Sequence, residues 1–125
     1  MSAERRPVFL NLLQIRLPWT GVASILHRVA GVILFLSIAP SLYLLQRSLD
    51  GESGWMHVVG LLHAPLMQPV LLLLFWAFWH HFLNGLRLLA MDLGHGFGRS
   101  VSARGSLWIL LLAPVLAVLC LGDLW

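Results

Sequence analysis

Three long apolar stretches constrain the fold of this 125-residue chain more than any other feature. They cover residues 22–46, 69–92 and 104–124, and each is close to the ~20 residues that a helix needs to cross a bilayer. Transmembrane strands are excluded because the runs are continuous rather than alternating and are too few to close a barrel. We therefore expect an all-α integral membrane protein. Residues 1–125 would form one membrane-anchor domain with an N-terminal segment, residues 1–20, and three transmembrane helices in a bundle.

The low charge of the chain agrees with a membrane setting. Only 10% of the residues are charged, whereas about a quarter are charged in a typical soluble domain. No basic stripe with interleaved aromatic residues occurs, which argues against nucleic-acid binding. The first stretch is also too long for the apolar region of a signal peptide, which would not contain His27 and Arg28. We expect it to be a retained helix.

The arginines predict the orientation, because positively charged loops stay on the cytoplasmic side of a membrane. Seven of the eight basic residues lie on one side, namely Arg5, Arg6, Arg16, Arg28, Arg87, Arg99 and Arg104. Only Arg47 lies on the other side. The N-terminus is therefore expected on the cytoplasmic or matrix side and the C-terminus on the far side. Between the first two spans, residues 55–63 are expected to form a short interfacial helix.

A first polar cluster lies at the start of the first span. Ser24, Arg28 and Gly31 are spaced i, i+4 and i+7, and His27 flanks them, so small and polar side chains share one helix face. One interpretation is a helix-packing face with an arginine that reaches back to the interface. The other is a site for a quinone, whose carbonyl oxygens need hydrogen-bond donors and a positive charge during reduction. The pattern alone leaves both open.

A second cluster surrounds His81 in the middle of the second span. His81 shares a helix face with Asn84 and Gly85, and a neutral imidazole is a common ligand of heme iron. A glycine one turn away would leave room for the porphyrin. The alternative, which the spacing alone favours, is a histidine hydrogen-bonded between helices. His80 points about 100° away and is the weaker ligand candidate. A second axial ligand would have to come from a partner subunit.

Two motifs on the first two spans resemble the cytochrome b membrane-anchor subunits of succinate dehydrogenase, in the type of respiratory complex II that has two small anchor subunits. The first motif runs from Arg6-Pro7-Val8 through Ile15-Arg16-Leu17-Pro18 to Ser24-Ile25-Leu26-His27-Arg28-Val29-Ala30-Gly31. The second comprises His81-x-x-x-Gly85-Leu86-Arg87 and Met91-Asp92-Leu93-Gly94. About half of the chain carries the resemblance, and the third span matches only as an apolar segment.

The resemblance implies a role for each candidate residue. Ser24 and Arg28 would line the ubiquinone pocket, and His81 would be an axial ligand of a single heme b shared with the partner anchor subunit. It also implies that His27 lies near a heme propionate. The chain departs from the family at two positions. Leu88 stands where the family commonly has histidine, and Ala30 stands where it usually has serine or threonine.

The resemblance also implies partners and a location. The chain would join a second small membrane-anchor subunit, an iron–sulfur subunit and a flavoprotein subunit in the lipid bilayer of a bacterial or mitochondrial inner membrane. Electrons from succinate oxidation would pass to ubiquinone. The chain alone is not expected to oxidise succinate, because it contains no flavin motif or cysteine-rich cluster motif. The alternatives are an anchor of a fumarate reductase of the menaquinol type and a heme-free structural anchor or transporter subunit.

Overall fold

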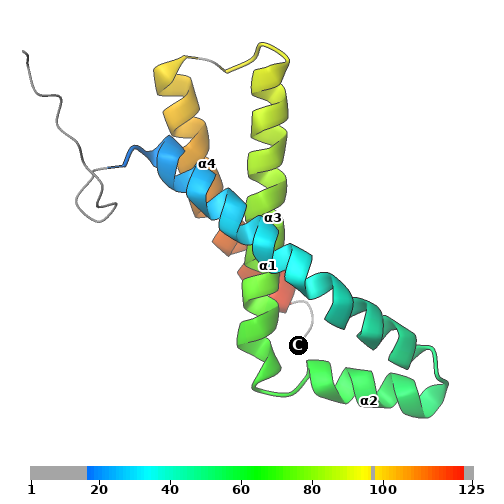
Figure 1. The fold of residues 1–125 in the computed structure, drawn as a ribbon. Coiled ribbons are helices and arrows are strands. Elements are labelled where there is room, and N and C mark those ends of the chain that lie inside the picture. Colours follow the sequence, from blue (N-terminus) through cyan, green and yellow to red (C-terminus); the bar gives the residue numbers. More distant parts are fainter. Residues whose placement is uncertain (1–16, 97, 123–125) are drawn as a thin grey trace, which may run out of the picture.

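The computed structural model describes residues 17–96 and 98–122, and within these ranges the chain is helical with no strand (Figure 1). The helices are α1 (Trp19–Ser48), α2 (Glu52–Leu62), α3 (Met67–Asp92) and α4 (Arg99–Gly122). Among the described residues, α1, α3 and α4 are long and apolar enough to cross a membrane. The prediction of an all-α protein with three transmembrane helices in a bundle is confirmed.

The helices extend beyond most ends of the predicted spans. α1 begins at Trp19 rather than residue 22, and α4 begins at Arg99 rather than residue 104. Hydropathy marks only the apolar part of a helix, whereas the backbone hydrogen bonds continue into the membrane interface. Most of the predicted N-terminal segment, residues 1–16, lies outside the described residues, as do the final residues of the third span.

The short helix expected between the first two spans is α2, which begins and ends slightly before residues 55–63. It follows a turn at Gly51, whose φ of 87° favours glycine. The next glycine, Gly54, is buried against α1, and a Cβ added there would collide with the carbonyl oxygen of Arg47. These two glycines let the chain reverse directly after α1.

The three long helices cross one another near their middles and separate toward their ends (Figure 1). The start of α1, the end of α3 and the start of α4 lie at the same end, which we call the Trp19 end. α3 makes its most extensive contacts with α4, and α1 crosses α3 at a steep angle. Beyond the crossing α1 diverges, and α2 spans the opening toward the start of α3.

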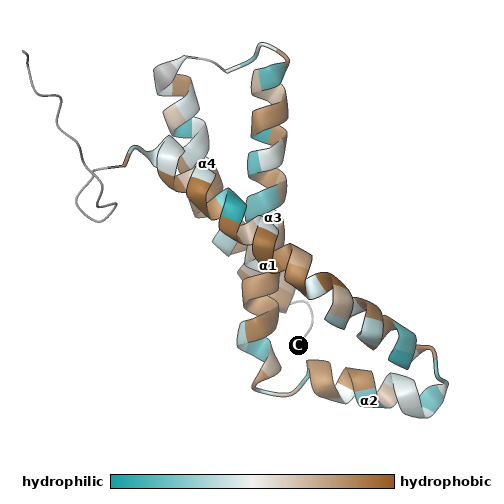
Figure 2. Ribbon diagram, in the orientation of Figure 1, coloured by the Kyte–Doolittle hydropathy of each residue, from teal (hydrophilic) through white to brown (hydrophobic). Residues whose placement is uncertain are grey.

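The packing places small side chains inside and large apolar side chains outside. The fully buried apolar residues are Ala23, Ala30, Ala77, Ala113 and Ala117. Phe35, by contrast, is 72% exposed and Trp108 is 69% exposed, and apolar residues cover much of the outer helix surfaces (Figure 2). Small residues allow membrane helices to approach closely while large apolar residues face lipid. The bundle therefore has the packing of a membrane protein.

Candidate functional site

His81 on α3 is held against the backbone of α1 by a hydrogen bond. Its Nδ1 lies 3.1 Å from the carbonyl oxygen of His27. Because a carbonyl can only accept, Nδ1 carries the hydrogen, and the Nε2 of the neutral ring keeps its lone pair. Within the described residues this Nε2 makes no hydrogen bond and is not enclosed by the chain. The ring is thus fixed with one nitrogen available to a ligand from outside.

Two further contacts with α1 fix the plane of the His81 ring. The rings of His27 and His81 stack with their centroids 4.1 Å apart and their planes 8° from parallel. On the same helix, a Cβ added to Gly31 would lie 3.0 Å from Cε1 and 3.2 Å from Nδ1 of His81. The absence of a side chain at Gly31 therefore lets the histidine approach α1.

Gly85, expected to leave room for a porphyrin beside His81, lies next to the ring of His27 in this chain. A Cβ added to Gly85 would lie 3.9 Å from Nε2 of His27, an ordinary van der Waals distance. That Nε2 is buried and has no hydrogen-bond partner among the described residues. The glycine in tight contact with His81 is Gly31, because the neighbouring helix, rather than the next turn of α3, approaches the ring.

His80 occupies the interior of the bundle. Its side chain is fully buried, and its Nε2 donates to the carbonyl oxygen of Ala23 at 3.2 Å. Ala23 and His27 lie one turn apart on α1. Two successive histidines of α3 therefore donate to carbonyls on successive turns of α1, and this pair of bonds fixes the rotation of α3 against α1.

Ser24 and Arg28 lie one turn apart on α1, and both are exposed. Neither side chain forms a hydrogen bond or ion pair with another described residue. Ser24 lines an open cavity of about 680 Å³ at the Trp19 end, and Arg28 does not. The cavity is lined by Pro18, Thr20, Ser24, Arg87, Leu88, Met91, Ser102 and Ala103. Within this chain, the two residues share a helix face without sharing the cavity.

Arg87 supplies the positive charge of that cavity, a role that the sequence did not indicate. Its guanidinium donates to Oδ1 of Asn84 at 3.3 Å and to Oγ of Ser102 on α4 at 2.6 Å. A Cβ added to Gly105 would lie 3.6 Å from its Nε, so this position on α4 leaves space for the arginine. The cavity combines a fixed guanidinium with hydroxyl groups, which suits a ligand that presents oxygen atoms.

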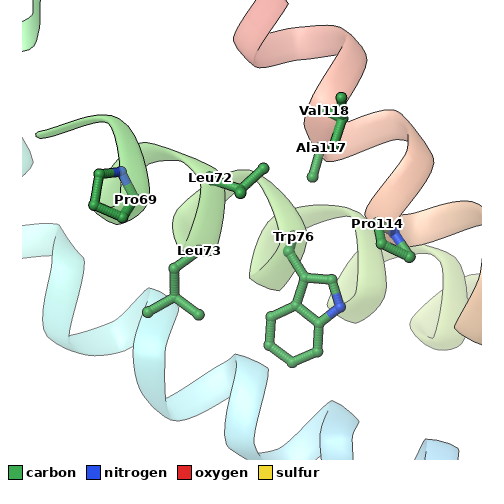
Figure 3. A pocket seen from close by; sticks show the side chains of 7 residues that line it. All are labelled: Pro69, Leu72, Leu73, Trp76, Pro114, Ala117 and Val118. Atoms are coloured by element: carbon green, nitrogen blue, oxygen red, sulfur yellow. The ribbon is translucent and has the colours of Figure 1, made fainter. Parts of the chain in front are cut away.

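A second cavity, of about 320 Å³, lies between the start of α3 and the second half of α4 (Figure 3). It is lined by Pro69, Leu72, Leu73, Trp76, Pro114, Ala117 and Val118. The indole nitrogen of Trp76 is the single polar side-chain atom in this set. Because polar groups are needed to orient a redox-active ring, the Trp19 end is the better candidate site.

Comparisons with known proteins agree on one family. Residues 2–121 match the family described as succinate dehydrogenase/fumarate reductase transmembrane subunit. The chain is 32% identical over 120 residues to a succinate dehydrogenase cytochrome b556 subunit of Coxiella burnetii, covering 94% of each chain. It is 29% identical to the subunit of that name from Paracoccus denitrificans, covering 97% of this chain and 93% of the relative.

Proposed function

Because this chain belongs to the family of succinate dehydrogenase/fumarate reductase transmembrane subunits, we propose that it is the heme-binding anchor of a succinate:ubiquinone oxidoreductase. Its relatives are named succinate dehydrogenase cytochrome b556 subunits. In this proposal the chain holds one axial ligand of heme b and part of the ubiquinone site. Electrons from succinate oxidation reach ubiquinone beside it.

The observation that carries the proposal is the hydrogen bond between His81 and the His27 carbonyl. Histidines that bind metals usually donate their second ring nitrogen to a carbonyl or carboxylate, which fixes the tautomer and orients the ring. His81 has this arrangement. The residues therefore fit a heme bound through Nε2 of His81. When bound, heme b supplies a one-electron carrier in the membrane.

His27 and a partner subunit would complete the heme site. The buried Nε2 of His27 has no hydrogen-bond partner among the described residues, so a heme propionate that reached this atom would satisfy it. The second axial ligand would come from the second anchor subunit, because Nε2 of His81 is not enclosed by the described part of this chain. Leu88, which replaces a histidine common in the family, cannot hydrogen-bond a propionate.

Ser24 and Arg28 would hold the quinone. Their side chains are exposed and have no partner among the described residues, so both are available as donors. A hydroxyl and a guanidinium one turn apart can reach one carbonyl oxygen from the same side. The open cavity beside Ser24 would admit part of the head group. Guanidinium groups do not give up a proton in proteins, so the protons for quinol formation must reach the oxygens through water or another group.

The partners follow from the family and the membrane packing. We propose a complex with flavoprotein and iron–sulfur subunits and a second anchor subunit in a bacterial or mitochondrial inner membrane. A fumarate reductase anchor acting on menaquinol remains the second candidate, because the family description covers both enzymes. The direction of catalysis does not alter the roles of His81, Ser24 and Arg28.

The reduced-minus-oxidised absorbance spectrum of the purified complex tests this proposal. We expect a b-type band that copurifies with the chain and a quinone reductase activity driven by succinate. A complex that reduces quinone without a b-type band would make the chain a structural anchor. A complex that has a b-type band but favours the reduction of fumarate by quinol would support the second candidate, a fumarate reductase anchor.

The proposed orientation is tested by reporter fusions. Because seven of the eight arginines flank one side of the spans, we expect a reporter fused after Trp125 to lie outside the cytoplasm. A reporter inserted near Ser102 should lie inside. Alkaline phosphatase and green fluorescent protein fusions distinguish the two sides. A cytoplasmic C-terminus would contradict the arrangement with three membrane crossings.

A further inference from the structure

Polar side chains of two helices are buried in the interior of the bundle. His80 and Asn84 lie one turn apart on α3 and are 0% and 1% exposed, and Ser106 on α4 is 0% exposed. Bulk water does not reach the interior of a membrane bundle, so each buried polar atom needs a partner supplied by the protein or by a bound molecule.

The hydrogen bond of His80 leaves one acceptor unpaired. Since its Nε2 donates to the Ala23 carbonyl, the other nitrogen of the neutral ring, Nδ1, carries a lone pair. This Nδ1 is buried and has no hydrogen-bond partner among the described residues. The ring cannot exchange its two nitrogens without losing the bond to Ala23.

Asn84 leaves one donor group unpaired on the next turn. Its Oδ1 accepts a hydrogen bond from the guanidinium of Arg87, which has no acceptor atom, so the orientation of the amide is fixed. Its Nδ2 is therefore the remaining donor of the amide. This atom too is buried without a partner in the described part of the chain. An unpaired acceptor and an unpaired donor thus belong to neighbouring turns of one helix.

We propose that one water molecule is bound inside the bundle, where it donates to Nδ1 of His80 and accepts from Nδ2 of Asn84. A cation would meet the N–H group of Asn84 and an anion would meet the lone pair of His80, whereas water satisfies both. Buried waters typically make about three hydrogen bonds. The hydroxyl of Ser106 donates to the Ser102 carbonyl at 3.0 Å and keeps lone pairs for the second hydrogen of the water.

This water would influence the position of His81 through the adjacent residue, His80. It would hold the His80 ring in the orientation that donates to Ala23 on α1, and His81 donates to the same helix one turn further on. The inference rests on the buried atoms of this chain alone. It holds whether or not the proposed heme and quinone sites are correct, so its failure and theirs can be told apart.

A structure of the assembled complex that resolves ordered waters tests the proposal directly. We expect density between His80 and Asn84 at about 2.7–3.2 Å from both nitrogens. A direct bond between the two side chains, or a gap without density, would overturn it. This measurement uses the unmodified complex and does not depend on whether any variant folds.

Paired substitutions give a second test, read as the rate at which the complex dissociates at a fixed elevated temperature. His80→Phe and Asn84→Leu should each accelerate dissociation about tenfold, because each leaves buried polar groups unpaired. The double variant should be no faster than the more severe single variant. Ser37 bonds within its own helix, so Ser37→Ala combined with His80→Phe should multiply the separate effects. Independent effects of His80→Phe and Asn84→Leu would contradict a shared water.

Discussion

The His81→Ala variant should lose the b-type absorbance of the complex, whereas the His80→Ala variant should keep most of it. His81 presents an open Nε2 at the outside of the chain. His80 is fully buried and bonded to Ala23, so its ring cannot reach a cofactor shared with another subunit. The measurement is the reduced-minus-oxidised absorbance per mole of purified complex.

Stability provides the control for this comparison. His80→Ala empties a buried site, and large-to-small substitutions in cores cost about 2–5 kcal/mol, so this variant should lower the thermal stability of the complex while sparing the band. His81→Ala should lower stability through loss of the cofactor, which binds only the associated state. Loss of the band in His80→Ala together with its retention in His81→Ala would show that His80, and not His81, is the heme ligand.

The Arg28→Leu variant should lose most quinone reduction and keep electron delivery to a soluble acceptor. A hydrogen bond that involves a charged group contributes about 1.5–3 kcal/mol, and Arg28 has no other partner among the described residues that would need it. Ser24→Ala removes a neutral donor and should have the smaller effect, about 0.5–1.5 kcal/mol. The measurement is the ratio of succinate–quinone activity to succinate–dye activity in the intact complex.

Two further variants separate geometry from charge at this site. Arg28→Lys should restore part of the activity, because an ammonium group keeps the charge but lacks the planar fork of the guanidinium. Arg104→Leu is the matched control: it removes an exposed arginine at the same end of the bundle, whose Nε bonds to Ser100 in its own helix, and should leave the ratio unchanged. An unchanged ratio in both Arg28→Leu and Ser24→Ala would show that this helix face serves helix packing rather than quinone binding.

The sequence predicted the fold well because a bilayer leaves few alternatives. A continuous apolar run of membrane-spanning length can satisfy its backbone only as a helix, so α1, α3 and α4 followed from length and composition. The ends of the helices did not follow, since polar residues such as Arg99 and Ser100 extend α4 without contributing hydropathy. The steep crossing of α1 over α3 was also not predictable, because it depends on which small residues meet.

For the candidate site, the sequence predicted only which helix face each residue occupies. Helical spacing separates His80 from His81 and unites Ser24 with Arg28. It does not reveal what a neighbouring helix presents, so it did not indicate that Gly31 on α1 lies against the ring of His81. For the same reason it did not indicate that Arg87 joins α3 to Ser102 on α4. Contacts between helices require the packed structure.

The second half of α1 bears on how the newly made chain survives in the cell. Beyond Ala30, α1 has no buried residue up to its end at Ser48. Lipid gives little drive for helices to associate, because it is as apolar as their surfaces, so within the described chain mainly the contact with α2 holds this half in place. Until other subunits cover it, we expect membrane quality-control proteases to degrade the chain. The abundance of this subunit should therefore follow the supply of its partners more closely than its own rate of synthesis.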